Sequence, residues 1–246
     1  MPNYRFGKHP PKVDYRTLRF ANYAAGLAAP PASLTVLDRV YKDLKTKDPT
    51  VLFPMDGNDT LGDCTIAALA HAITVYRGLT ATKKVIMSKQ NVVKLYMHLT
   101  GGVDSGLNEL DVLNYWRQNS VDGDKILSFV SISPKNHTHV QQAIQLFGGV
   151  YLGFQVQQNC VQEFDTHQPW TPGPLTSDGH AVYAVGYDQN QLTVLTWGNT
   201  QQATWAWWDE CVDEAYAILP AEAKASDFTP GFNFAQLQAD LSAVAS

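Results

Sequence analysis

The stretch Asn58-Asp-Thr-Leu-Gly-Asp-Cys64-Thr-Ile-Ala-Ala-Leu-Ala-His71 decides the fold, because it sets a thiol on the first turn of a helix. Gly62 permits a tight turn, Asp63 can cap a helix, and apolar residues then recur at helical spacing. Unpaired N–H groups and the macrodipole at a helix start favour a thiolate, which predicts a low pKa and a nucleophilic Cys64. An isolated cysteine is more often a packing residue, so the rest of the chain has to decide.

The composition is that of an ordinary globular protein. The chain has 246 residues, of which 45% are hydrophobic and 17% charged, enough for one large domain or two small ones. A net charge of -5 leaves no basic footprint, so we expect neither nucleic acid nor a membrane as a partner. The first residues lack the apolar region of a signal peptide and no apolar run is long enough to span a membrane, which predicts a cytoplasmic location. The oligomeric state is not determined by these features.

The chain contains three cysteines, Cys64, Cys160 and Cys211. Three cysteines cannot all pair within one chain, so at least one thiol is free. They also lack the Cys-x-x-Cys spacing of a metal site, and we expect neither a metal nor an organic cofactor. For Cys160 and Cys211 the surrounding residues predict a packing role.

The hydrophobic period changes along the chain. Residues 1–50 form a Pro- and Tyr-rich arm that we expect to pack on the domain. Residues 51–125 predict a helical half, with helices over 64–78, 88–98 and 108–118. Residues 126–220 predict a β half, with strands over 126–132, 150–156, 180–187, 192–197, 204–208 and 215–219 and a helix over 140–147. Residues 221–246 predict a helical tail. This order predicts an α+β fold with a cleft between the two halves.

A nucleophilic thiol needs a base, and histidine suits that role at neutral pH. His180 opens a predicted strand directly after the flexible Ser177-Asp178-Gly179, so its ring can project into the cleft. His71 lies two turns along the Cys64 helix, roughly 10 Å away, which is too far. The other histidines lie in the arm or in polar surroundings that indicate surface positions. The residues therefore predict a Cys64–His180 pair.

Four segments, in order, resemble the papain-like (C1-type) cysteine peptidases. Residues 58–65 resemble the family's Gln-x-x-x-x-x-Cys stretch, residues 104–113 its groove-lining loop and helix, and residues 140–156 the helix and strand of its β half. Residues 179–187, Gly-His-Ala-Val-Tyr-Ala-Val-Gly-Tyr, match its His-Ala-Val-x-x-Val-Gly-Tyr strand closely. The resemblance covers roughly residues 53–219 and implies a papain-like fold with an antiparallel, barrel-like β half.

The resemblance also implies roles for individual residues. Cys64 would be the nucleophile and His180 its base, while Asn58 falls where the family has a glutamine that binds the oxyanion. The family's Asn-Ser-Trp-Gly is Leu-Thr-Trp-Gly here, so the residue that orients the histidine is replaced by leucine. Thr196 or Asn199 would take its place, and Asn199 has the right chemistry at a shifted position. The candidate substrate-binding residues are Gly62, Asp63, Ser105, Gly106, Gly179 and Trp197.

These observations predict a cysteine hydrolase that cleaves an amide in a peptide or small amide substrate through a thioacyl intermediate on Cys64. Two alternatives remain open: a thiol acyltransferase of the transglutaminase type with the same site, and a catalytically inactive papain-like binding module. The arm lacks the long helical pro-segment of the family, so we expect it to be a poor inhibitor.

Overall fold

The computed structural model describes residues 3–42, 44, 46–80, 86–228 and 230–245. The helices are α1 (Leu37–Val40), α2 (Pro49–Leu52), α3 (Cys64–Leu79), α4 (Lys89–Leu99), α5 (Glu109–Gln118), α6 (His137–Phe147), α7 (Cys160–Asp165), α8 (Trp205–Cys211) and α9 (Phe234–Ala245). The strands are β1 (Leu34–Thr35), β2 (Ile126–Ser131), β3 (Val150–Gln157), β4 (Leu175–Tyr187), β5 (Gln191–Thr196), β6 (Asn199–Thr204) and β7 (Val212–Pro220). Short 3-10 turns span Phe20–Asn22 and Ala225–Asp227.

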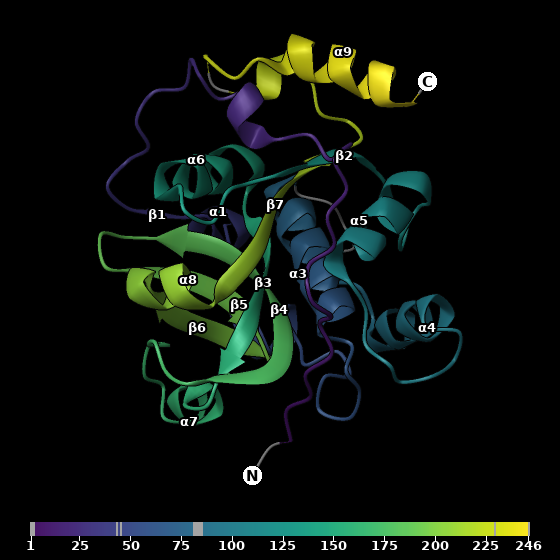
Figure 1. Ribbon diagram of the computed structural model, residues 1–246, viewed down its shortest axis with the longest axis vertical. Coiled ribbons are helices and arrows are strands. Elements are labelled where there is room, and N and C mark those ends of the chain that lie inside the picture. The colour runs from purple at the N-terminus through teal and green to yellow at the C-terminus, as the bar shows by residue number, and fades with distance from the viewer. Residues whose placement is uncertain (1–2, 43, 45, 81–85, 229, 246) are drawn as a thin grey trace.

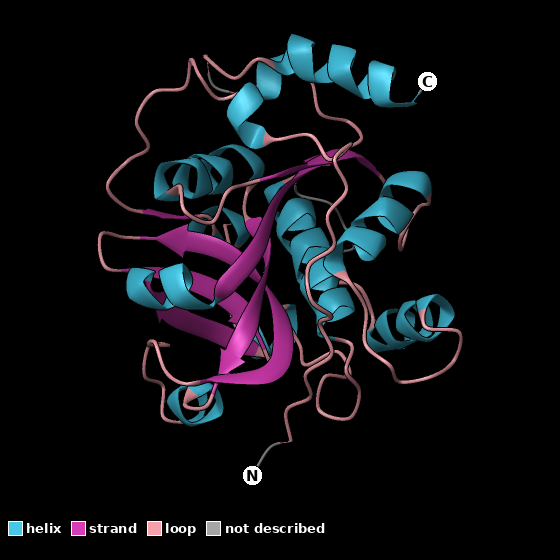
Figure 2. Cartoon of the chain, viewed as in Figure 1, coloured by secondary structure: helices cyan, strands magenta, loops and turns pink. Residues whose placement is uncertain are grey.

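One antiparallel sheet organises the second half of the chain (Figure 2). Its strands lie in the order β2-β7-β3-β4-β5-β6. The arm adds the short strand β1, which pairs with the end of β4. A barrel closes only when its edge strands pair. Among the described strands, β2 and β6 lie at the two edges of the sheet and do not pair with each other. Strand β2 contacts α5, and β6 leads directly into α8. The sheet is therefore open, and the barrel-like β half that the resemblance implied does not close into a barrel.

Helix α3 lies against the sheet and carries Cys64 at its first residue. Its sequence is almost uniformly apolar or small, and Ile66 and Ile73 are completely buried. Helix α4 lies on the side of α3 away from the sheet (Figure 1), and α5 contacts both α3 and the edge strand β2. The Tyr151 hydroxyl on β3 donates to the Thr65 carbonyl, 2.9 Å away, and so joins the sheet to the first turn of α3. This packing holds the start of α3 against the middle of the sheet.

The sequence misplaced several elements of the β half. Residues 204–208, rich in tryptophan, were expected to be a strand, but α8 begins there because the Thr204 hydroxyl caps it by accepting from the Trp207 N–H. Strand β4 begins at Leu175, so His180 lies inside the strand and does not open it. The sequence did not predict α7 or β6. Among the described residues, no helix combines the length and apolarity needed to cross a membrane.

Candidate active site

Cys64 and His180, far apart in the sequence, line one small cavity between α3 and the sheet. Cys64 is the first residue of α3, and His180 lies opposite Phe154 in the pairing of β4 with β3. The cavity has a volume of about 10 Å³, and both side chains are almost fully buried. Asn58, Thr196 and Trp197 also line it. The fold thus brings together the nucleophile and base that the sequence predicted.

The imidazole of His180 is held on several sides. Its Nε2 lies 2.9 Å from the Thr196 hydroxyl, and its Nδ1 has no hydrogen-bond partner among the described residues. The Trp197 indole stacks on the ring, with centroids 4.6 Å apart, and the Phe154 ring meets it edge-on. The ring is therefore fixed by one hydrogen bond at Nε2, which leaves Nδ1 free to exchange a proton.

Asn199 does not orient His180, so that prediction was wrong. Its side-chain oxygen accepts from the Thr200 N–H, 2.8 Å away, at the start of β6. Trp197 and Gly198 both have positive φ angles, 47° and 76°, and form a two-residue turn between Thr196 and Asn199. The turn leaves Thr196, the last residue of β5, beside the imidazole. Thr196, the alternative that the sequence left open, occupies the orienting position.

Asn58 is buried beside Trp197. Its side-chain oxygen accepts from the Trp197 indole N–H at 2.8 Å. Its amide nitrogen donates to the carbonyls of Arg5, at 2.8 Å, and Leu61, at 3.1 Å. Both amide protons are therefore engaged, and one of them is held by the arm.

Residues 4–9 of the arm, which we call the cleft segment, run through this site, and the purple trace of the arm passes in front of α3 (Figure 1). The Lys8 N–H donates to the Gly179 carbonyl at 3.1 Å, and the His9 N–H donates to the Leu107 carbonyl at 2.9 Å. The Phe6 ring meets His180 edge-on, with centroids 5.7 Å apart. The arm therefore bridges both walls of the cleft.

The candidate substrate-binding residues lie along the cleft segment. Gly62 and Gly106 leave room for its backbone: a Cβ on Gly106 would lie 2.3 Å from the Gly7 oxygen, and a Cβ on Gly7 would lie 1.9 Å from the Gly62 oxygen. The Ser105 carbonyl contacts His9 Nε2 at 2.7 Å. The Trp197 ring packs on Tyr4, and the Gly179 carbonyl accepts from Lys8 as described above.

Asp63, predicted to cap α3 and to bind substrate, does not cap the helix with its side chain. It occupies the N-cap position of α3, but its side chain makes no capping hydrogen bond. Burial, with the nearby charge of Asp56, raises the pKa of Asp63 to about 8. The side chain is fully buried, and neither carboxylate oxygen has a hydrogen-bond partner among the described residues.

Burial controls the protonation of the Cys64–His180 pair. It raises the pKa of the Cys64 thiol to about 12, although the backbone N–H groups of Ala181 and Gly7 partly oppose it. Burial, and then the proximity of His71, lowers the pKa of His180 to about 3. Desolvation of the charged forms outweighs the effect of the helix dipole. The predicted low pKa of the Cys64 thiol is therefore wrong for the protein with the cleft segment in place, which we call the closed protein. The pair is present as a neutral thiol and a neutral imidazole.

His71 also lines the cavity, although its distance along α3 had set it aside as the base. Its Nε2 lies 3.0 Å from the Pro54 carbonyl, and burial lowers its pKa to about 4. Two full turns of helix place His71 on the same face of α3 as Cys64, and this spacing could have predicted that both residues line one cavity. The sequence contained no comparable signal for the path of the cleft segment.

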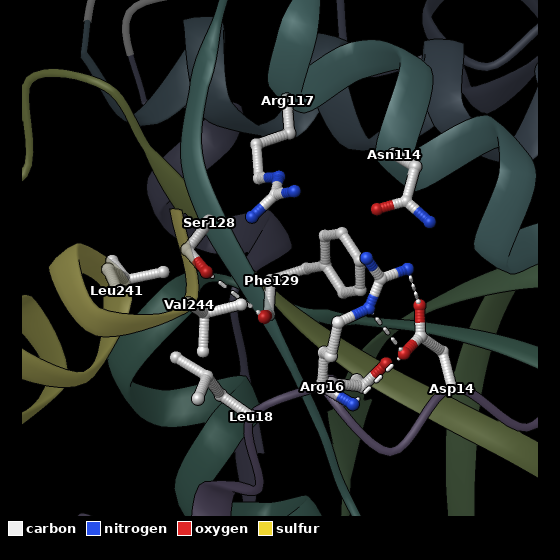
Figure 3. A pocket seen from close by; sticks show the side chains of 10 residues that line it. Asp14, Arg16, Leu18, Asn114, Arg117, Ser128, Phe129, Leu241 and Val244 are labelled. Atoms are coloured by element: carbon white, nitrogen blue, oxygen red, sulfur yellow. Dashed lines mark hydrogen bonds and ion pairs between the residues drawn. The ribbon is translucent and has the colours of Figure 1, made fainter. Parts of the chain in front are cut away.

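No group of three or more His, Cys, Asp or Glu side chains among the described residues could hold a metal ion. A separate cavity of about 60 Å³ lies between the arm, α5, β2 and α9. Figure 3 shows that Arg16 there pairs with Asp14 while Arg117 reaches toward the same space. It contains neither Cys64 nor His180, so it is distinct from the candidate active site.

Several solved structures resemble this one. Xylellain, a cysteine protease from Xylella fastidiosa, is 18% identical with a TM-score of 0.68, over 88% of this chain and 96% of that one. The cysteine protease and lectin-like domains of Cwp84 from Clostridium difficile are 15% identical with a TM-score of 0.57, over 92% of this chain and 57% of that one. The Carica candamarcensis cysteine protease CMS1MS2, in complex with E-64, is 15% identical with a TM-score of 0.55, over 79% of this chain and all of that one.

At this level of identity the likeness concerns the fold. The chain has a papain-like fold, which confirms the predicted class, with the open sheet described above. No family model matches the sequence, and no curated protein matches it.

Proposed function

We propose that this protein is a cysteine hydrolase that cleaves an amide bond of a peptide, with Cys64 as nucleophile and His180 as base. The observation that carries the proposal is the shared cavity: Cys64 at a helix start and His180 on the facing strand line it together, with the Thr196 hydroxyl at Nε2 of the ring. A thiol, an imidazole and a group that orients the imidazole are the parts that nucleophilic acyl transfer needs.

The proposed reaction has two stages. His180 takes the proton of the Cys64 thiol as Sγ attacks the carbonyl carbon, and the imidazolium then protonates the departing amine. Water, deprotonated by the neutral imidazole, next attacks the thioester and releases the acid and the free thiol. Thr196 holds Nε2, so that Nδ1 is the nitrogen that exchanges the proton.

The oxyanion of each tetrahedral intermediate needs donors at the start of α3. The Cys64 backbone N–H is one candidate, since the first N–H groups of a helix have no partner within the helix. The Asn58 amide is the other, and it now donates to the Arg5 carbonyl. A substrate carbonyl would take over this hydrogen bond after the arm has left.

The closed protein is therefore proposed to be latent. The cleft segment covers the thiol, engages Asn58 and keeps water away from the Cys64–His180 pair. Displacing it would rehydrate both side chains, lower the pKa of the thiol and raise that of the imidazole, which favours the reactive ion pair. Catalysis then requires that the arm moves, is cleaved or is displaced by the substrate.

Gly7→Ala provides the test, because its Cβ would overlap the Gly62 carbonyl and exclude the arm without altering the cleft wall. We expect Gly7→Ala to hydrolyse fluorogenic peptide amides faster than wild type, and Gly7→Ala/His180→Ala to have no activity above background. Val13→Ala, an exposed substitution elsewhere in the arm, should behave as wild type. Equal activity with and without His180 would contradict the proposal.

The same assay addresses the two alternatives. Added hydroxylamine traps an acyl-enzyme as hydroxamate, so a transferase should form hydroxamate as its main product and a hydrolase mostly free acid. An inactive binding module should bind peptide in the Gly7→Ala background without releasing either product.

A further inference from the structure

The side chain of Lys8 is buried in an acidic pocket beside the cleft, which we define by Glu109, Gly153, Asp213 and Glu214. Lys8 Nζ lies 2.9 Å from Asp213 Oδ1 and 3.1 Å from Glu214 Oε1, and only 1% of the side chain is exposed. Burial alone would lower the pKa of Lys8, but the carboxylates of Glu109, Glu214 and Asp213 raise it. An ammonium ion therefore fills the pocket.

The walls of this pocket belong to the body of the protein. Glu109 comes from the first turn of α5, while Asp213 and Glu214 come from β7, so all three carboxyl groups remain when the arm leaves. Glu109 is completely buried, and neither of its carboxylate oxygens has a hydrogen-bond partner among the described residues. Such a group is costly unless a donor or cation reaches it.

Gly153 makes the space that the lysine fills. A Cβ at this position of β3 would lie 1.8 Å from Lys8 Cε and 3.0 Å from Glu109 Oε1. Any larger residue would therefore shorten the pocket. The acidic pocket is therefore long enough for a lysine side chain, and carboxyl groups line its inner end.

The backbone contacts of Lys8 place the acidic pocket next to the Cys64–His180 pair. The Lys8 N–H donates to the carbonyl of Gly179, the residue before His180, and Lys8 pairs with Leu107 on the opposite wall. These backbone groups of the cleft are available to any extended chain, because main-chain pairing does not depend on the side chains. A peptide that replaced the cleft segment would thus present one side chain to the acidic pocket.

An anchoring role alone accounts poorly for this arrangement. A buried ion pair is often no more stabilising than well-packed apolar residues, so fastening the arm does not require three carboxyl groups in the body. Once the arm has left, the buried carboxyl groups of Glu109 and Glu214 would lie beside the one-third exposed carboxylate of Asp213 without a counter-ion. The open protein would then favour a ligand that brings its own cation.

We propose that the acidic pocket selects a lysine or arginine side chain of the peptide substrate and that Lys8 occupies it in the closed protein. This inference rests on the proposed function, because it takes the Cys64 cleft as the place where a peptide lies. It goes further by assigning the substrate class to peptides with a basic residue and the selectivity to Glu109, Asp213 and Glu214.

Binding in trans tests the pocket separately from the chemistry. The full-length variant Gly7→Ala/Cys64→Ala is titrated with a labelled peptide of residues 4–12 and with analogues that carry norleucine or glutamate at the position of Lys8. We expect the lysine peptide to bind at least about tenfold more tightly than the norleucine peptide, and the glutamate peptide more weakly still. Equal affinities would overturn the proposal. If Gly7→Ala does not fold, Lys8→Met, which removes the charge of the occupant, replaces it in the same titration.

Matched variants identify the source of the preference. Asp213→Asn/Glu214→Gln removes two of the three carboxylates and should reduce the lysine preference to less than about threefold. Glu210→Gln removes an exposed carboxylate on α8 and should leave the preference intact. A preference that persists unchanged in Asp213→Asn/Glu214→Gln would overturn the assignment to this pocket.

Hydrolysis separates this inference from the proposed function. With Cys64 intact, Gly7→Ala is given fluorogenic peptides in which lysine, arginine, leucine or glutamate is placed in turn at each position before the scissile bond. A rise in kcat/KM of tenfold or more for lysine and arginine at one position supports the inference. Cleavage with no such preference overturns it and leaves the hydrolase intact. Selective binding of the lysine peptide without cleavage supports the pocket and refutes the hydrolase.

Discussion

The backbone N–H of Gly7 lies close enough to the Cys64 thiol to lower its pKa in part, so the arm sits directly over the proposed nucleophile. The closeness of Gly7 to the Gly62 carbonyl allows no side chain at this point. Gly7, together with Gly62 and Gly106 on the cleft walls, thus lets the arm enter the cleft.

Substituting Gly7 should release the cleft segment. In wild type, hydrogen bonds to the cleft walls protect the N–H groups of Arg5, Lys8 and His9. Gly7→Ala should remove this protection, because its Cβ would overlap the Gly62 backbone. Hydrogen exchange measured by mass spectrometry on a peptide spanning residues 4–12 checks this, with Val13→Ala as the control. Unchanged protection in Gly7→Ala would show that the arm is not held by this contact.

Thr196 should position His180 through its hydroxyl. Thr196→Val preserves the shape of the side chain and removes the partner of Nε2, which costs about 1–3 kcal/mol for a buried group. In the Gly7→Ala background we expect kcat to fall about 10- to 100-fold with little change in KM. Thr196→Ser should restore kcat and the pH profile. A Thr196→Val variant with unchanged kcat would remove Thr196 from the mechanism.

Asn58 should stabilise the oxyanion once Arg5 has left. Asn58→Ala in the Gly7→Ala background removes a transition-state donor, and we expect kcat to fall on the order of 10²- to 10³-fold. Asn58→Gln retains both the donor and the acceptor for Trp197, so it should keep most of the activity. Steady-state kinetics of the three proteins decide the question. A similar loss in Asn58→Gln and Asn58→Ala would point to packing and not to hydrogen-bond donation.

Asp63 should make stability depend on pH. Its pKa is raised from 3.8 to about 8 by burial and then by Asp56, so between these values the folded protein holds a proton that the unfolded chain has lost. This contribution to the free energy of unfolding is fully present below about pH 4 and is lost as the pH rises toward 8. Asp63→Asn cannot ionise, so its stability relative to wild type should rise with pH across this interval. Urea denaturation at pH 4, 6 and 8 measures the difference, and a constant difference would contradict the raised pKa.

The sequence predicted well the elements with strong local signals. Helix α4 starts after Ser88, whose hydroxyl accepts from the Asn91 N–H, and Asn108 caps α5 in the same way. The long apolar period of α3 and the short apolar run of β3 were equally clear. Their boundaries depend on residues adjacent in the chain, so local reasoning was sufficient.

The remaining features depend on contacts between distant segments. The tryptophans of α8 favour a strand locally, but Thr204 caps a helix and Trp207 and Trp208 are buried by tertiary packing. The identity of the residue beside His180 depended on the turn at Trp197 and Gly198, which no pattern revealed. The prediction of a low pKa for the Cys64 thiol failed for the same reason, because the burial that raises this pKa comes from tertiary packing and not from the helix start itself.

Intact-mass analysis after treatment with an E-64-type epoxide tests the central claim most directly. The account predicts slow labelling of wild type at pH 7, rapid addition of one epoxide to Cys64 in Gly7→Ala, and loss of this rapid labelling in Gly7→Ala/His180→Ala. Cys160 and Cys211, both buried, should stay unmodified in all three proteins. Labelling of Cys64 at the same rate in Gly7→Ala with and without His180 would contradict an active thiol and imidazole pair beneath the arm.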